Sequence, residues 1–214
     1  VRFDFLQRHS VGNAPYTYYV YQQLYDNDGK PIQNAFVDRD GNGTINDNDR
    51  YMAVTADGKA IKPAPDFFYG ITFKATWKNW DFGFNGHGSV GNWLFNDAYA
   101  SHSTTNANIN YNYIANYSRS VLRSGFHSSN ITAQSFSDMF LENASFFRMD
   151  DINLGYTFKW RSQKSTIRIA LSAQNVFVLT KYSGLDPEAS GENGIDSSMW
   201  PRPRVYSLRA AINF

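Results

Sequence analysis

The sequence contains several segments in which apolar and polar residues alternate with a period of two, and the last of them is the clearest. In residues 204–214 the apolar positions of one face are Tyr206, Leu208, Ala210, Ile212 and Phe214. Because successive side chains of a strand point to opposite faces, this segment is predicted to be a strand with one apolar face. An apolar face that stays complete up to Phe214 is typical of the closing strand of a transmembrane β-barrel.

Four further segments alternate in the same way and form two pairs. Residues 67–77 have the length of roughly 9 to 11 residues that a tilted strand needs to cross a bilayer. The other three alternating segments are residues 81–89, 151–158 and 167–174. Short turns at residues 78–80 and 161–165 join the two members of each pair. The pattern therefore predicts two hairpins before the closing strand.

The connections alternate in length along the chain. Long polar segments occupy residues 8–66, 92–145 and 178–203, whereas the turns inside the hairpins are short. A transmembrane barrel has this arrangement because its loops are long on one side and its turns are short on the other. A weaker segment at residues 1–6 brings the count to about six strands. Six strands are fewer than the eight of the smallest barrels, so this piece is not expected to close alone.

Bulky aromatic residues gather at the predicted turn side of these strands. They are Trp77, Trp80, Phe158, Trp160 and Phe214. Aromatic rings are favoured at membrane interfaces because one edge prefers lipid and the other tolerates water. The five residues are therefore predicted to form an aromatic rim at one interface.

Composition agrees with a membrane barrel and excludes several other classes of protein. Aromatic residues make up 17% of the chain and charged residues only 18%, against about 25% charged in a typical soluble domain. The net charge of +1, without a basic run, gives no footprint for nucleic acid. The absence of Cys excludes disulfides and thiolate sites. No apolar stretch is long enough for a spanning helix, and no signal peptide is recognisable, so the chain is expected to be part of a longer protein.

Residues 38–49 match the spacing of a twelve-residue calcium loop. The residues at its ligand positions are Asp38, Asp40, Asn42, Thr44 and Asp49, and Gly43 stands where such loops turn sharply. Hard oxygen ligands at alternate positions can wrap around one Ca²⁺. Position twelve is Asp where Glu is usual, and no helix is expected to flank the loop. The alternative is a metal-free turn in which Asp and Asn side chains accept hydrogen bonds from backbone amides.

No pattern of residues predicts an enzyme. The four histidines lack metal-ligand spacing, and no nucleophile, Walker or dinucleotide motif is present. The long polar segments contain aromatic residues that could stack on and hydrogen-bond a sugar or a peptide. The candidates are Trp93, Tyr99, Tyr111 and Tyr113. The alternative for each of them is a hydrated surface loop.

Four stretches carry a resemblance to a known family. They are YTYYVYQQLYDNDGKPIQNAFVDRDGNGTINDNDRY, NASFFRMDDINLGYTF, SAQNVFVLTKYSGLDPE and WPRPRVYSLRAAINF. In this order they resemble the C-terminal part of a SusC/RagA-type TonB-dependent outer-membrane transporter, over most of the chain. The resemblance implies an all-β fold, with this chain supplying about the last six strands of a 22-stranded antiparallel barrel.

The same resemblance implies a function and partners. It implies import of oligosaccharides or peptides across the outer membrane of a Gram-negative bacterium, with a SusD-like surface lipoprotein as a cap. The plug domain and the segment that contacts TonB would lie outside residues 1–214. Phe214 would be recognised by the barrel-assembly machinery. A second hypothesis from another class is a secreted β-sandwich that is stabilised by calcium and binds carbohydrate.

Overall fold

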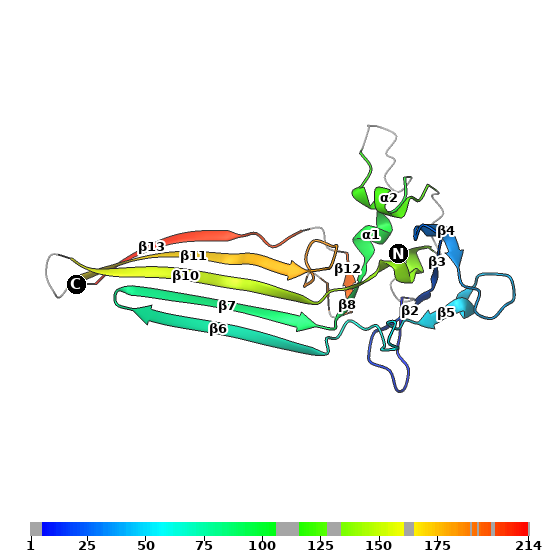
Figure 1. Cartoon of the computed structure of the whole chain (residues 1–214), viewed down its shortest axis with the longest axis horizontal. Helices are drawn as coiled ribbons and strands as arrows, with labels where there is room; N and C mark the ends of the chain where they lie inside the picture. The colour runs from blue at the N-terminus through cyan, green and yellow to red at the C-terminus, as the bar shows by residue number, and fades with distance from the viewer. Residues whose placement is uncertain are drawn as a thin grey trace. The chain divides into compact units, whose positions relative to one another are not determined.

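The computed structural model (Figure 1) describes residues 6–105, 116–127, 134–160, 165–188, 190–191, 193–197 and 200–213. The chain divides into two compact units, each assembled from three separate segments. The first, called the sheet unit, consists of Pro65–Gly91, Ala144–Lys181 and Trp200–Phe214. The second, called the loop unit, consists of Val1–Ala64, Asn92–Asn143 and Tyr182–Met199.

The sheet unit is one antiparallel sheet of five long strands, which Figure 1 shows side by side. In chain order the strands are β6 (Phe67–Trp77), β7 (Trp80–Val90), β10 (Phe146–Trp160), β11 (Ser165–Thr180) and β13 (Val205–Asn213). Their order in the sheet is β13-β11-β10-β7-β6. The five alternating segments are therefore confirmed as strands, and so is the alternation of long and short connections. Of the weaker segment at residues 1–6, residues 1–5 lie outside the described residues, so this strand stays a prediction.

Three of these strands are longer than the alternation predicts. Trp80, expected in a turn, begins β7 and pairs with Trp77. Strand β10 begins at Phe146 rather than near Asp151, and β11 continues to Thr180, so the third long connection starts at Lys181. For β10 the cause is a bulge, where Met149 pairs with Gly86 and Asp151 with the adjacent Asn85, so that Asp150 is an extra residue. Along β10 this bulge moves the apolar positions from odd numbers, such as Phe147, to even numbers, such as Ile152, so the strict period of two is interrupted there.

One face of the sheet is apolar and exposed. Ladder partners across all five strands form rows such as Ala75, Phe82, Leu154, Leu171 and Leu208. Leu171 is 58% exposed, Leu208 is 72% exposed and Tyr206 is 76% exposed. A β-sandwich would bury such a face against a second sheet. Among the described residues no second sheet covers this face, so the sheet unit does not form the hypothesised secreted β-sandwich.

The opposite face of the sheet is polar and holds a close ion pair. The Nε and Nη2 atoms of Arg168 on β11 donate to the two carboxylate oxygens of Asp81 on β7, at 2.9 and 2.5 Å. The pair crosses β10 at Gly155, where a β-carbon would lie 2.5 Å from Nη2 of Arg168. Only glycine leaves room for this bridge. His87 and Asp150 form a second polar contact at 2.6 Å.

The loop unit contains short strands and helices rather than unstructured loops. One small sheet joins β1 (Gln7–Arg8), β2 (Thr17–Tyr21) and β5 (Arg50–Met52), and another joins β12 (Ile195–Asp196), β8 (Trp93–Asn96) and β9 (Leu141–Asn143). Strands β3 (Gln23–Tyr25) and β4 (Pro31–Phe36) pair with each other. The helices are α1 (Asp97–Ser101) and α2 (Arg119–Ser124), with 3-10 turns η2 (Asp47–Asp49), η3 (Gln134–Phe136) and η4 (Asp138–Phe140). Within the described ranges, no helix is both long and apolar enough to span a membrane.

A hydrophobic core holds the loop unit together. Leu6, Tyr18, Phe95, Phe126 and Phe140 are fully or almost fully buried, and they come from segments far apart in the sequence. The ring of Phe140 packs edge-on against Phe95 at 5.9 Å between centroids. Because the first two long connections and part of the third share this core, they form one packed body.

Candidate functional site

The calcium-type loop lies in the loop unit, directly before β5, and it gathers three of its four carboxylates. Asp38, Asp40 and Asp49 each offer an oxygen atom, and these atoms all lie within 4.8 Å of one another. The loop closes because Asp38 accepts hydrogen bonds from the backbone N–H groups of Gly41 and Gly43, both at 2.8 Å. Both glycines have positive φ, which glycine adopts without strain. The structure therefore brings the carboxylates of positions one, three and twelve together.

Asp49 anchors the end of this loop. It is fully buried, and its two carboxylate oxygens accept hydrogen bonds from the backbone N–H groups of Asn46 and Arg39, each at 2.8 Å. The Asn46 N–H, more than that of Arg39, holds the pKa of Asp49 below its ordinary range. Asp49 is therefore ionised at neutral pH.

The donor set of the loop fits a hard cation. Three carboxylates converge, and Asn42 adds a side-chain oxygen that also accepts the N–H of Thr44 at 2.7 Å. Oxygen ligands of this kind suit Ca²⁺, which takes six to eight of them. Each carboxylate oxygen that accepts one backbone N–H keeps a second lone pair. The backbone hydrogen bonds and a bound cation are thus compatible.

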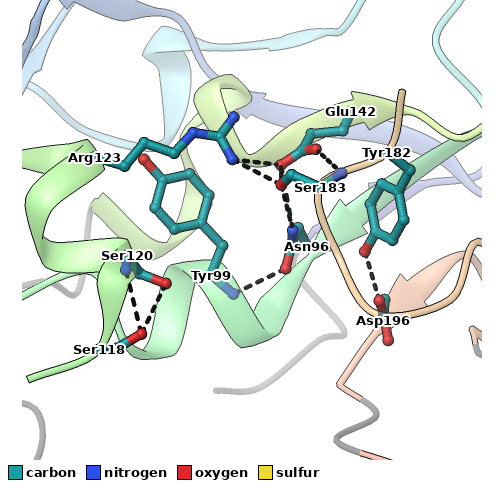
Figure 2. A network of polar contacts seen from close by, with 9 residues as sticks. All are labelled: Asn96, Tyr99, Ser118, Ser120, Arg123, Glu142, Tyr182, Ser183 and Asp196. Atoms are coloured by element: carbon teal, nitrogen blue, oxygen red, sulfur yellow. Dashed lines mark hydrogen bonds and ion pairs between the residues drawn. The ribbon is translucent and has the colours of Figure 1, made fainter. Parts of the chain in front are cut away.

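A second feature of the loop unit is a pocket of about 720 Å³ beside α1 and α2. Its lining includes Tyr99, His102, Arg119, Arg123, Ser183 and Leu185. Figure 2 shows the polar network next to it, in which Arg123 of α2 points toward Glu142 of β9 and toward Ser183. The pocket is therefore built from three stretches of chain that are distant in sequence.

Glu142 is the centre of that network. Its Oε1 atom accepts from Ser183 Oγ at 2.6 Å and from Asn96 Nδ2 at 3.2 Å, and its Oε2 atom accepts from the Ser183 backbone N–H at 2.8 Å. The Nη1 atom of Arg123 donates to Ser183 Oγ at 2.7 Å and lies 3.4 Å from Glu142 Oε1. Because these contacts converge on one carboxylate, they fix the position of the Arg123 guanidinium.

A buried pair lies behind the network. The hydroxyl of Tyr182 donates to Oδ2 of Asp196 at 2.6 Å, and both side chains are buried. Burial, followed by the neighbouring carboxylate of Asp196, raises the pKa of Tyr182 far above its ordinary value. Tyr182 therefore stays protonated and acts as a hydrogen-bond donor that holds the segment before Ser183 against β12.

Two of the predicted ligand-contacting aromatics lie in the loop unit core region. Tyr99 lines the pocket, but its ring is buried between the guanidinium of Arg123, 4.6 Å from the ring centroid, and the ring of Phe140 at 5.1 Å. Trp93 packs against the core, and its carbonyl accepts the hydroxyl of Tyr18 at 3.0 Å. Tyr111 and Tyr113 lie outside the described residues. A direct contact of these aromatics with ligand stays a prediction.

The aromatic residues predicted to form a rim lie at the turn end of the sheet where the structure describes them. Trp77 and Trp80 pair across the β6–β7 turn, and Trp80 packs edge-on against Tyr156 at 4.7 Å. Phe158 pairs with Ile167 at the same end of the sheet. The side chain of Trp160 and the whole of Phe214 lie outside the described residues. Their place at a membrane interface, and the role of Phe214 in assembly, stay predictions.

Comparisons with known proteins agree on one family of receptors. No protein-family model matches the chain. The TonB-dependent receptor SusC of Bacteroides thetaiotaomicron is 38% identical over 216 residues, which cover 98% of this chain and 20% of SusC. The TonB-dependent receptor P3 of Formosa agariphila is 26% identical over 202 residues, which cover 87% of this chain and 19% of P3. The chain thus spans about a fifth of the length of these relatives.

Solved structures show the same fold. The structure of the RagAB peptide transporter matches with a TM-score of 0.62 at 21% identity, and the match covers 92% of this chain and 22% of the transporter chain. The RagAB peptide importer in the open-open state matches with a TM-score of 0.58 at 18% identity, with the same two coverages. At these identities the likeness establishes the fold, and the sequence of SusC establishes the relationship. The chain belongs to the SusC/RagA-type TonB-dependent receptors, and its five long strands are a section of their antiparallel β-barrel.

Proposed function

We propose that the receptor containing this chain imports oligosaccharides or peptides across the outer membrane, driven by TonB and assisted by a SusD-like surface lipoprotein. Its 38% identity to the receptor SusC supports this function, as does its fold likeness to RagAB, a peptide importer. No catalytic role is proposed for any residue. TonB would be contacted by parts of the receptor outside this chain.

The observation that carries the proposal is the two-faced sheet. The exposed apolar rows, such as that of Leu154, Leu171 and Leu208, would contact outer-membrane lipid, and the face with Asp81 and Arg168 would line the lumen. The edge strands β6 and β13 would pair with the rest of the barrel. The loop unit consists of the long connections, which lie on the outer side in barrels of this kind. It would therefore meet substrate and the lipoprotein there.

Uptake of labelled oligosaccharides tests this function. The oligosaccharides to label are those that support growth only when the receptor is present. We expect cells that lack the receptor to lose their uptake, and cells that lack TonB to lose it as well. The matched control is uptake of a monosaccharide small enough for general porins, which should not change. Uptake that continues at the wild-type rate without TonB would contradict the proposal.

We also propose that residues 38–49 bind one Ca²⁺ through Asp38, Asp40, Asn42 and Asp49 and the carbonyl of Thr44. The convergence of three carboxylate oxygens within 4.8 Å supports this site. Bringing these like charges together is unfavourable unless a cation or hydrogen bonds offset the repulsion. A bound ion would fix the loop that precedes β5 and would strengthen the loop unit without taking part in transport.

Calorimetric titration of the chelator-treated receptor tests the calcium site. We expect Ca²⁺ to bind the wild-type receptor, and the double variant Asp38→Asn/Asp40→Asn to bind at least tenfold more weakly, because two charged ligands are lost. The control is Asp57→Asn, an exposed aspartate of the loop unit whose carboxylate accepts from Thr55 at 2.6 Å. Equal Ca²⁺ affinity in the double variant and the wild type would exclude the loop as the site.

A further inference from the structure

The pocket beside α1 and α2 has a positively charged lining. Arg119 and Arg123 both line it, and no Asp or Glu does so among the described residues. The two arginines are four residues apart on one helix, so they lie on the same face. Like charges at this spacing destabilise an isolated helix. An anion in the pocket would offset this repulsion.

Arg123 is held so that half of its guanidinium is free. Ser183 and Glu142 occupy only its Nη1 atom, and its flat face lies over the ring of Tyr99. Its Nε and Nη2 atoms make no hydrogen bond within the described part of the chain, and in Figure 2 the second terminal nitrogen points away from Glu142. These two atoms form the fork that binds a carboxylate with two parallel hydrogen bonds. Arg123 is therefore positioned in advance for such a ligand.

Arg119 and Ser120 add further donors to the pocket. Arg119 is exposed, and its side chain makes no hydrogen bond or ion pair with other residues that the structure describes. The Ser120 hydroxyl accepts from Ser118 Oγ at 3.1 Å, which leaves its own proton for another acceptor. Few apolar side chains line the pocket, and Leu185 is the largest of them after Tyr99. This lining suits a ligand that carries hydroxyl groups together with a negative charge.

We infer that the pocket binds an acidic oligosaccharide and that the carboxylate of a uronate unit is taken by Arg123, with Arg119 beside it. The inference rests on the proposed import function and narrows its substrate class. The volume of about 720 Å³ is within the range of small-molecule sites, roughly 300 to 1,000 Å³. The ring of Tyr99 is covered by Arg123, so the charge of the ligand rather than aromatic stacking provides recognition.

Binding of trigalacturonate to the purified full-length receptor tests the inference. We expect the wild-type receptor to bind trigalacturonate at least tenfold more tightly than the neutral trimer of galactose. Arg123→Gln should remove most of this preference, and Arg119→Gln should reduce it. The matched control is Arg8→Gln, which removes an exposed arginine of the same unit. Arg8 lies over the ring of Tyr19, and neither residue lines the pocket.

Three results would overturn the inference. One is equal affinity of the wild-type receptor for the charged and the neutral trimer, a comparison that needs no variant. Another is an unchanged preference in Arg123→Gln. The third is tight binding of an acidic tripeptide in place of trigalacturonate. TonB-dependent uptake of a neutral oligosaccharide together with any of these results would leave the import function intact and reject only the uronate pocket.

Discussion

The variant Gly86→Val is expected to lower the amount of folded receptor in the outer membrane several-fold. A β-carbon at Gly86 would lie 2.6 Å from the backbone oxygen of Arg148 and 3.0 Å from the ring of Phe147. The backbone oxygen cannot turn aside freely, because β7 and β10 pair on both sides of this point, with Arg148 opposite His87 before the bulge and Asp151 opposite Asn85 after it. Forcing bulk into a well-packed site costs about 1 to 3 kcal/mol, and more where backbone must move. The two strands would have to separate beside the bulge at Asp150.

Heat-modifiable mobility on electrophoresis gels measures the folded fraction of the receptor. The matched control is Gly70→Ala on the neighbouring strand β6, where a β-carbon would come no closer than 3.9 Å to the backbone oxygen of Gly86. This control should assemble normally. Normal amounts of folded Gly86→Val receptor would show that β7 and β10 do not approach as closely as the structure has them.

The variant Gln23→Leu is expected to loosen the loop unit while the barrel stays folded. Gln23 is buried, and its Oε1 atom accepts from Gln134 Nε2 at 2.6 Å and from Ser137 Oγ at 2.9 Å. Its Nε2 atom donates to the carbonyl oxygens of Leu24 and Ile32 at 2.9 and 2.7 Å. Leucine cannot replace these bonds, and each buried polar group left without a partner costs about 1 to 3 kcal/mol.

Limited proteolysis of the full-length receptor in detergent measures this loosening. We expect faster cleavage within the loop unit in Gln23→Leu and unchanged heat-modifiable mobility of the barrel. The control is Gln22→Leu, the adjacent residue, which is only half-buried and whose Oε1 atom accepts from Arg39 at 2.8 Å. Equal cleavage rates in the two variants would show that the bonds of Gln23 do not hold the unit together.

The long strands could be predicted from the sequence because their signal is local. A strand with lipid on one face and water on the other must alternate at every second residue, and β6 has the bounds that its alternation predicts. The calcium-type loop was recognisable for the same reason. Its carboxylates come from a single stretch of twelve positions, and the structure brings three of them together.

The loop unit and the pocket could not be predicted in this way. Arg123 and Ser183 meet although 60 positions separate them in the chain, and Glu142 comes from a third segment. Ser183 lies in one of the stretches that carry the family resemblance, but no spacing or periodicity links it to Arg123 or Glu142. Their contact follows from the shared core around Phe95 and Phe140, which joins segments that individually read as polar loops.

The sequence by itself determined that this chain forms long amphipathic strands, which of their faces is apolar, and which family it resembles. The tertiary structure alone decided where the strands begin and end beyond the bulge at Asp150, and which distant side chains line one pocket. The physical reason is the range of the interactions. The alternation of a strand and the ligands of a calcium-type loop involve residues that are close in the chain. The register of strands at a bulge and the packing of a buried core depend on residues that only folding brings together.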